Sequence, residues 1–418
     1  MRFHPVIFLL PMAAAAQDAR FAGSKACAAC HAEISRRYAA TGMAQSSGIV
    51  GGGQFREAFA HAEFSDSAFG AKYRVTTRPG GYRLEFSRES SGVAGERRLQ
   101  WFIGSGHAGR SYLFSLGGFL FQSPVSYYSA SARWGVSPWY QRSSSINLTR
   151  PVEARCLQCH ASRLDPIAGT ENGFRDPPFL EGGIGCERCH GPGREHIARM
   201  SSGRGGPPGI VNPARLAPAR RDSVCAQCHL TGAARIARLR PPHDVYQPGA
   251  LLSDYSAFFV WSGSDLPAMK VASHFERLQQ SRCKKASGDR LWCGTCHDPH
   301  GEPANAAYYR TRCETCHRPA DCKASTEARA QRQDNCIACH MPKSPVADAQ
   351  HAVYTDHSIP RRPLAANQSP GTARTLVPFW KTPADERDLA LAYAAVGDGQ
   401  RATALLQRAE TRDPRDVA

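Results

Sequence analysis

Apolar and polar residues alternate along two stretches of the N-terminal half of the chain. Residues 72–89 (KYRVTTRPGGYRLEFSRE) alternate on either side of a Pro-Gly-Gly turn, and residues 110–128 (RSYLFSLGGFLFQSPVSYY) repeat the pattern around Gly117 and Gly118. Both stretches are rich in aromatic residues. They predict two β-hairpins, and we expect these to form a small antiparallel sheet near the N-terminus.

The C-terminal segment has a helical pattern instead. Residues 384–416 read as two helices joined by Gly-Asp-Gly-Gln, and their small and apolar residues are spaced as in a tetratricopeptide repeat. The positions that match are Ala390, Tyr393, Ala402, Leu406, Ala409 and Pro414. A single repeat cannot bury its own face. Either the pair docks on the rest of the chain, or the chain is a truncated copy of a longer one, and we favour truncation.

The N-terminus has the pattern of a secretory signal. Arg2 is followed by the apolar stretch 6–12 and by Ala14 and Ala16, which predicts cleavage before Gln17. A buried N-terminal helix is the alternative. No other stretch approaches the ~20 apolar residues of a membrane span. We expect residues 1–16 to be removed and the mature chain to be periplasmic or extracellular.

Cysteine is the anomaly in the composition. Fourteen of the sixteen cysteines fall into seven copies of C-x-x-C-H, here numbered motif 1 to motif 7 in chain order. These cysteines are Cys27, Cys30, Cys156, Cys159, Cys186, Cys189, Cys225, Cys228, Cys293, Cys296, Cys313, Cys316, Cys336 and Cys339. C-x-x-C-H is the attachment motif of c-type haem. Two thiols one turn apart each bind a porphyrin vinyl group, and the adjacent histidine binds iron.

Two other uses of the cysteines fit less well. Zinc sites would need the motifs to converge in pairs, which an odd number opposes, and would leave the histidine unexplained. A disulfide framework has no need of that histidine either. We therefore predict seven covalently attached haems c, with proximal ligands His31, His160, His190, His229, His297, His317 and His340. The remaining Cys283 and Cys322 form a disulfide around motifs 5 and 6, or stay as separate thiols.

Enough histidines remain to fill the distal positions. His4 leaves with the signal peptide, and His243 follows two prolines and looks like a loop residue. The predicted distal ligands are His61, His107, His196, His274, His300, His351 and His357. Met43 and Met341 are rival thioether ligands.

His300 and His196 each follow an attachment motif closely. His300 is three residues from His297, a reach of at most about 10 Å. The chain cannot pass around the porphyrin edge in that distance, so His300 serves a neighbouring haem or none. The same reasoning applies to His196, six residues after His190. A histidine that ligates a neighbour's iron brings two haems into close contact.

The chain is basic, with a formal net charge of +16. Fourteen propionates and seven bis-histidine irons would bring this to about +9 when oxidised and about +2 when reduced. Much of the arginine content then neutralises propionates, and no motif supports binding to nucleic acid.

Three blocks resemble a bacterial family of exported multihaem c-type cytochromes: GIGCERCHGPGREH, HFERLQQSRCKKASGDRLWCGTCHDPHG and NCIACHMPKSPVADAQHAVYTDHSI. Members often continue into tetratricopeptide repeats, and the family is related to the tetrahaem electron acceptor of hydroxylamine oxidoreductase. The resemblance covers residues 24–416. It implies electron transfer through bis-histidine haems. It also implies that His196, His274, His300, His351 and His357 are distal ligands. His61 and His107 match less tightly, and RRYAATGMAQS keeps Met43 as a rival at the first haem.

The predicted fold is a mainly α-helical and irregular multihaem cytochrome c fold, with a small antiparallel β region near the N-terminus and a C-terminal helical hairpin. The region 151–365 is too rich in Pro and Gly for long elements. The expected domains are 17–150 (motif 1 and the β region), 151–365 (six haems), the linker 366–383 and the helical pair 384–418.

We expect the chain to relay electrons between redox partner proteins of the periplasm or envelope, with the helical pair as a docking surface. The alternative is an oxidoreductase that acts on a small nitrogen or sulfur species at one five-coordinate haem. All seven motifs end in histidine, which argues against that alternative. The first haem, isolated in sequence, is the position where we would expect such a site.

Overall fold

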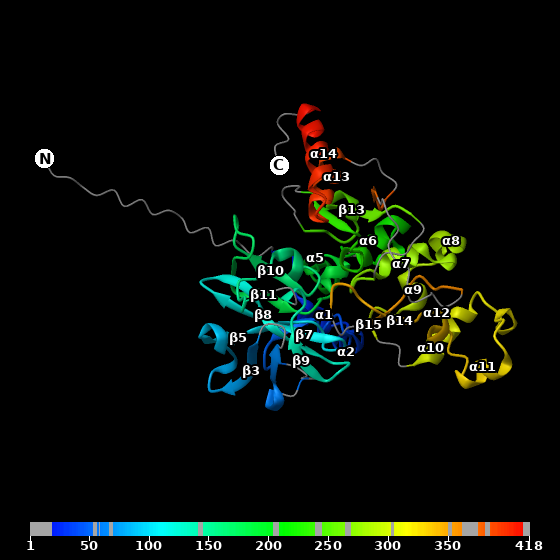
Figure 1. Ribbon diagram of the computed structural model, residues 1–418. Coiled ribbons are helices and arrows are strands. Elements are labelled where there is room, and N and C mark those ends of the chain that lie inside the picture. Colours follow the sequence, from blue (N-terminus) through cyan, green and yellow to red (C-terminus); the bar gives the residue numbers. More distant parts are fainter. Residues whose placement is uncertain are drawn as a thin grey trace.

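The computed structural model describes residues 19–52, 57, 59–66, 70–140, 145–203, 209–238, 245–263, 269–301, 305–349, 353–361, 375–380 and 385–412. The predicted signal peptide, His243 and His351 lie outside these ranges. In Figure 1 the N-terminal β-sheets lie at lower left, helices α13 and α14 stand at the top, and α10 to α12 lie at the right. No helix in the described part of the chain is long and apolar enough to cross a bilayer.

Two antiparallel sheets form the N-terminal body. The first sheet has the order β1 (Ser47–Ile49), β6 (Trp101–Ile103), β7 (Gly109–Leu116), β8 (Phe119–Tyr128) and β9 (Arg133–Val136). The second has the order β2 (Glu63–Asp66), β3 (Ala71–Arg78), β4 (Gly81–Arg88) and β5 (Val93–Leu99). Both hairpins predicted by alternation are present, as β3–β4 and β7–β8. The sheets pack on each other through Val75 and Leu84 on one side and Tyr112 and Val125 on the other.

Three further sheets lie among the attachment motifs. They are β10 (Ala161–Pro166) with β11 (Phe174–Gly182), β12 (Ala234–Ala237) with β13 (Ser256–Trp261) and β16 (Leu376–Pro378), and β14 (Lys343–Pro345) with β15 (Val353–Thr355). The β10–β11 hairpin and Leu157 of motif 2 pack against Leu113 and Leu120 of the first sheet. This contact places motif 2 directly beside the N-terminal body.

The prediction of a mainly helical and irregular fold with only a small β region is wrong. The described residues contain five sheets that extend from Ser47 to Pro378. Strand β16 pairs with β13, which lies more than a hundred residues earlier in the chain, and β12 pairs with the other edge of β13. Their few residues carry no alternation long enough to detect, because tertiary pairing decides such strands more than local propensity does.

The helices are short, and most of them carry or flank a motif. They are α1 (Ser24–Ala28), α2 (Ala32–Ala39), α3 (Ala154–Leu157), α4 (Glu187–His190), α5 (Arg194–Ser201), α6 (Pro218–His229), α7 (His274–Gln280), α8 (Arg282–Ser287), α9 (Cys293–Cys296), α10 (Ala306–Glu314), α11 (Thr326–Gln331), α12 (Cys336–His340), α13 (Glu386–Ala395) and α14 (Gly399–Arg412). Turns of 3-10 helix connect them, among them η1 (Phe59–His61).

The C-terminal helices α13 and α14 form the predicted pair and dock on the β12–β13–β16 sheet, as Figure 1 shows. Ala390 and Tyr393 of α13 and Leu405 of α14 are buried with Ile236 and Phe259 of the sheet. The Tyr393 hydroxyl also accepts a hydrogen bond from the Leu376 backbone N–H at 3.0 Å. The sheet therefore covers the face that a single repeat could not bury alone. The tetratricopeptide assignment itself stays a prediction.

Candidate haem-attachment site

Each attachment motif contains a helical turn. The histidine N–H of motifs 1, 3, 5 and 6 donates to the carbonyl of the first cysteine at 2.9–3.0 Å. Such a turn places the two thiols one helical turn apart and carries the histidine just beyond them. The local structure thus fits the chemistry of haem attachment at a porphyrin edge.

Motif 3 is joined to the segment that contains motif 1. The Glu187 carboxylate, 4% exposed, accepts backbone hydrogen bonds from Ala22 and Gly23 at 2.8 Å each and from Gly193 at 2.7 Å. The Cys186 N–H donates to the Ser24 hydroxyl at 2.9 Å. These bonds hold the two motifs side by side, although more than a hundred residues separate them.

Motifs 2, 3 and 4 contact one another through the two residues between their cysteines. Arg188 donates to the Gln158 carbonyl at 2.9 Å, and the Gln227 side chain donates to the Arg188 carbonyl at 3.0 Å. The contact between motifs 2 and 4 is reciprocal. The Cys159 thiol lies 3.9 Å from the Gln227 carbonyl, and the Cys228 thiol lies 3.9 Å from the Gln158 carbonyl. The variable positions of the motif are therefore the ones that pack motifs together.

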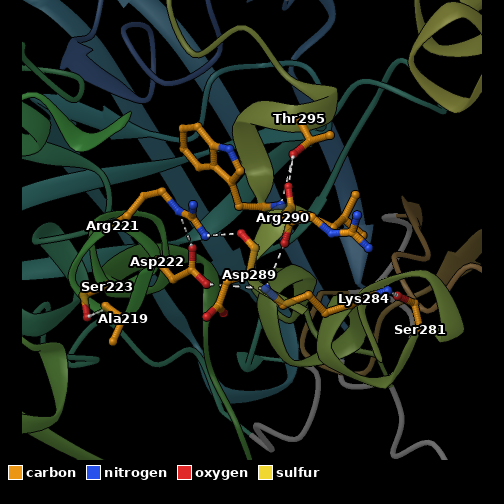
Figure 2. Close-up of polar contacts among 11 residues, drawn as sticks. Ala219, Arg221, Asp222, Ser223, Ser281, Lys284, Asp289, Arg290 and Thr295 are labelled. Carbon is orange, nitrogen blue, oxygen red and sulfur yellow. Dashed lines mark hydrogen bonds and ion pairs between the residues drawn. The ribbon is translucent and has the colours of Figure 1, made fainter. Parts of the chain in front are cut away.

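A polar network, drawn in Figure 2, connects motif 4 to motif 5. Arg221 of α6 stacks on the Trp292 ring at 4.8 Å and donates to the Asp289 carbonyl at 3.1 Å. Lys284 of α8 donates to the Leu291 carbonyl at 2.8 Å, and its Nζ lies 3.7 Å from an Asp222 carboxylate oxygen. The loop that leads into motif 5 is thus held by the helix that carries motif 4.

Motifs 5, 6 and 7 follow one another at the right of Figure 1. The Tyr309 hydroxyl of α10 lies 3.4 Å from Nδ1 of His297 in motif 5. Arg310 of the same helix pairs with Glu314 at 2.7 Å and with Asp334, just before motif 7, at 3.4 Å. Helix α10 ends in motif 6, so it contacts both neighbouring motifs.

In three pairs of histidines, the two rings face each other at a separation that leaves room for one porphyrin between them. His190 and His300 have ring centroids 5.8 Å apart and planes 12° apart. The corresponding values are 6.4 Å and 15° for His31 and His196, and 6.1 Å and 27° for His297 and His357. Two imidazoles bound to opposite sides of one metal ion through bonds of about 2 Å have centroids about 6 Å apart. The spacing fits an iron between each pair.

A fourth pair is closer and has a different orientation. His229 and His274 have ring centroids 5.3 Å apart and planes 84° apart. The His274 ring also lies beside that of His357, at 4.8 Å and 78°. The pairs His229–His274 and His297–His357 therefore lie beside each other. In each of the four pairs a histidine of one motif faces a histidine from a different segment.

Three of the predicted histidine ligands are held through Nδ1, which leaves Nε2 to face a metal. Nδ1 of His190 lies 2.8 Å from the Val211 carbonyl, Nδ1 of His340 lies 3.0 Å from the Pro360 carbonyl, and Nδ1 of His357 lies 3.0 Å from the Thr355 carbonyl. Metal-bound histidines are oriented by this kind of second hydrogen bond.

Burial favours the neutral form of His297 in motif 5 and of His274, which faces motif 4. It lowers the pKa of His274 to about 2, with smaller contributions from the charges of His357, His229 and His297. It lowers the pKa of His297 to about 4, with a smaller contribution from His357. A neutral imidazole has the free lone pair that metal binding requires.

The histidines of motifs 2, 6 and 7 have no second histidine opposite them in the described structure. Among the described residues no ring contact joins His160, His317 or His340 to a second histidine, and Nδ1 of His160 is buried without a hydrogen-bond partner. The Ser46 hydroxyl lies 2.8 Å from the His160 carbonyl and 2.8 Å from the Met43 carbonyl.

The remaining histidine candidates lie elsewhere or cannot be placed. His107 packs against Gly42, where an added Cβ would lie 3.4 Å from the His107 ring. His61 is exposed on η1. His351 lies outside the described residues.

No disulfide joins Cys283 and Cys322 in the described structure, where Cys283 is half-buried. Cys283 lies near the thiols of Cys296 and Cys316, whereas Cys322 is exposed.

Sequence reasoning missed the polar residues that hold the ligands in place. These are Glu187 in motif 3, Arg37 and Asp298 beside His300, and Glu276, Arg277 and Asp356 beside His274 and His357. The available signal was position, because all of these residues except Arg37 lie within three residues of a predicted ligand or inside a motif.

Comparison with known proteins agrees with this site. Residues 130–191, which contain motifs 2 and 3, match a family model described as cytochrome c554 and c-prime. The fold is similar to that of the outer cell wall cytochrome OcwA, with a TM-score of 0.51, 15% sequence identity, and coverage of 81% of this chain and 79% of the other. No curated protein matches the chain. The match and the similar fold support a multihaem c-type cytochrome with covalently attached haem.

Proposed function

We propose that this chain carries seven covalently bound haems c, numbered here as their motifs, and relays electrons along them in the cell envelope. The observation that carries the proposal is the pairing of histidines across motifs. A histidine that follows motif 3 faces motif 1, and one that follows motif 5 faces motif 3. Each haem would then share a chain segment with its neighbour, which keeps the haems close.

The axial ligand pairs follow from the ring contacts. They are His31 with His196 at haem 1, His190 with His300 at haem 3, His229 with His274 at haem 4, and His297 with His357 at haem 5. When bound, the haems supply the reversible one-electron chemistry of iron. The residues of the chain hold the imidazoles, orient them through Nδ1 and exclude water.

For haems 2, 6 and 7 the distal ligand is proposed from the sequence. His61, His107 and His351 remain the histidine candidates. His107 and Met43 are candidates for haem 2, because Ser46 hydrogen-bonds both the Met43 and His160 carbonyls and His107 packs on Gly42. A thioether ligand would raise the potential of that haem.

The order of the relay follows from the motif contacts. Motif 1 contacts motif 3, and motifs 2, 3 and 4 contact each other. Motif 4 is joined to motif 5, motif 5 to motif 6, and motif 6 to motif 7. Because thioether bonds lie at the porphyrin edge, contact between motifs brings those edges together. Haems 1 and 7 would then be the two ends, with haem 2 as a branch.

The remaining assignments complete the proposal. The mature chain starts after residue 16, with a domain of motif 1 and β-sheets (17–150), a six-haem domain (151–365), a linker (366–383) and the helical pair (384–418). It exchanges electrons with proteins of the periplasm or envelope. The exposed face of α14 remains available as a docking surface, since α13 and Leu405 pack on the sheet.

One observation favours the alternative of an oxidoreductase. It changes the haem proposed to bind substrate from haem 1 to haem 2. The sequence suggested haem 1, but His31 faces His196. His160, like His317 and His340, has no facing histidine in the described part of the chain, and of these three only His160 has a buried Nδ1 without a hydrogen-bond partner. Haem 2 is therefore the position where a small nitrogen or sulfur species would bind iron.

Low-temperature EPR of the oxidised holoprotein separates the two functions, with the number of haems counted by intact-protein mass spectrometry. Seven low-spin ferric centres support a pure relay. A high-spin centre that shifts on addition of nitrite, hydroxylamine or sulfite supports the oxidoreductase. Fewer than four low-spin centres would contradict the proposed ligand pairs.

A further inference from the structure

Helix α7 joins ligands of two different haems without carrying an attachment motif. Its first residue, His274, faces His229 of motif 4, and the same ring lies 4.8 Å from that of His357. His357 in turn faces His297 of motif 5. One turn of helix thus lies between haem 4 and haem 5, and its polar side chains could set the position of both sets of ligands.

Glu276 of this turn holds the segment that leaves motif 4. Its carboxylate, 4% exposed, accepts hydrogen bonds from the Gly232 N–H at 3.0 Å and the Thr231 N–H at 3.4 Å. Lys270, just before the helix, donates to the Gly232 carbonyl at 2.9 Å. Gly232 has a φ of +63°, and a Cβ there would lie 2.6 Å from the Phe259 carbonyl. The segment that follows motif 4 is therefore held against α7 by these hydrogen bonds.

Arg277 of the same turn holds the segment that carries His357. Its Nε donates to Asp356 Oδ1 at 2.9 Å, and its Nη2 donates to Oδ2 of the same carboxylate. The side chains are 6% and 0% exposed. Asp356 also accepts a hydrogen bond from the Ser358 N–H at 2.8 Å and donates its own N–H to the Pro342 carbonyl at 2.9 Å. Asp356 thus fixes the backbone directly before His357 through its own N–H and directly after His357 through its carboxylate.

We infer that Arg277 and Asp356 are positioning residues. Their ion pair fixes the positions of His274 and His357, the distal ligands of haems 4 and 5, relative to each other. The inference rests on the ligand pairs of the proposed function. A bidentate ion pair fixes both the distance and the angle between its two segments. Here one segment begins with His274 and the other carries His357. Loss of either partner leaves a buried charge unpaired, and the Asp356 segment would move to reach water. His357 would then leave the iron of haem 5, and His274 would lose the ring packed beside it.

The test compares the wild-type holoprotein with Asp356→Asn and Arg277→Lys. We expect each variant to show a new high-spin ferric signal in low-temperature EPR and, after reduction, to bind up to about one further equivalent of carbon monoxide per chain. Spectroelectrochemical titration should show shifts in the potentials of two haems, with the others unchanged. Arg277→Lys keeps the charge and loses the bidentate geometry, so its effect should be the smaller one.

Asp388→Asn is the matched control, because it breaks the Arg238–Asp388 pair (3.0 Å) between the sheet and α13, where no predicted haem ligand lies. Spectra of Asp356→Asn and Arg277→Lys that equal the wild type would overturn the inference, as would the same high-spin signal in Asp388→Asn. Should Asp356→Asn fail to fold, Arg277→Lys decides. The proposed function is judged on the wild type alone, so the two can fail separately.

Discussion

His190 and His300 face each other with their ring planes 12° apart, although the first belongs to motif 3 and the second follows motif 5. The backbone N–H of His300 is held by the Asp298 carboxylate at 2.9 Å, and Asp298 forms an ion pair with Arg37 of α2. Three segments of the chain therefore meet at this ring. The sequence argument excluded His300 from its own haem, and the structure places it opposite a different motif.

Substitution of His300 should change one haem only. In the proposed ligand set, His300→Ala would remove the sixth ligand of haem 3, so we expect one low-spin EPR signal to be replaced by a high-spin signal. In His300→Met the iron should stay low-spin and its potential should rise, because a thioether stabilises ferrous iron. Loss of more than one low-spin signal in His300→Ala would show that the ring serves a wider structural role.

Removal of the Arg37 side chain should have little effect on stability. Its pair with Asp298 is 44% and 36% exposed, and exposed ion pairs contribute about 0–1 kcal/mol. We expect Arg37→Ala to lower the free energy of unfolding by less than about 1 kcal/mol in denaturant titration. A larger loss would mean that the contact of the guanidinium with the Gly301 backbone also matters, since a Cβ at Gly301 would lie 2.7 Å from Arg37 Nη2.

Glu187 should be far more sensitive than an exposed carboxylate. Glu187→Gln keeps one oxygen but turns an amide group toward a backbone N–H, and a buried donor left unsatisfied costs about 1–3 kcal/mol. We expect a loss of about 2–3 kcal/mol in the free energy of unfolding, with altered EPR signals of haems 1 and 3. Glu33→Gln is the control, because Glu33 is 65% exposed. An equal effect of the two variants would contradict the role of Glu187 between motifs 1 and 3.

The network of Figure 2 predicts a difference between two adjacent lysines. Lys284 is buried and donates to the Leu291 carbonyl, whereas Lys285 is exposed. Lys284→Met leaves that carbonyl without its donor, and we expect a loss of about 1–3 kcal/mol in thermal or denaturant unfolding. Lys285→Met should change stability by less than about 0.5 kcal/mol. Equal stability of both variants would show that the loop before motif 5 is held by other contacts.

A substitution in the helical pair α13–α14 should lower the stability of the protein without changing the haem spectra. Tyr393→Phe removes the hydroxyl that accepts the Leu376 N–H, which leaves a buried donor unsatisfied. We expect a loss of about 1–2 kcal/mol in the free energy of unfolding. The haem absorption and EPR spectra should remain those of the wild type, because α13 and α14 pack on a sheet and carry no attachment motif. A changed haem spectrum would place the pair closer to the relay than this fold indicates.

Local patterns predicted some elements and missed others for one reason. The hairpins β3–β4 and β7–β8 have strands of eight to ten residues, long enough for alternation to appear. Strands β14, β15 and β16 have three residues each, so no periodicity can form. Strands β14 and β15 pair with each other and β16 pairs with the distant β13, so these strands depend on their partners and not on a local pattern. This is why the chain was wrongly predicted to be mainly helical.

The sequence by itself determined the haem chemistry, because C-x-x-C-H brings two thiols and an imidazole together within one helical turn whatever the rest of the fold does. It also excluded His300 from its own iron, since three residues of chain have a fixed maximum length. Only the tertiary structure decided which histidine faces which motif. That choice depends on buried contacts such as Glu187 with Ala22 and Arg277 with Asp356, whose members are far apart in sequence and carry no local signal.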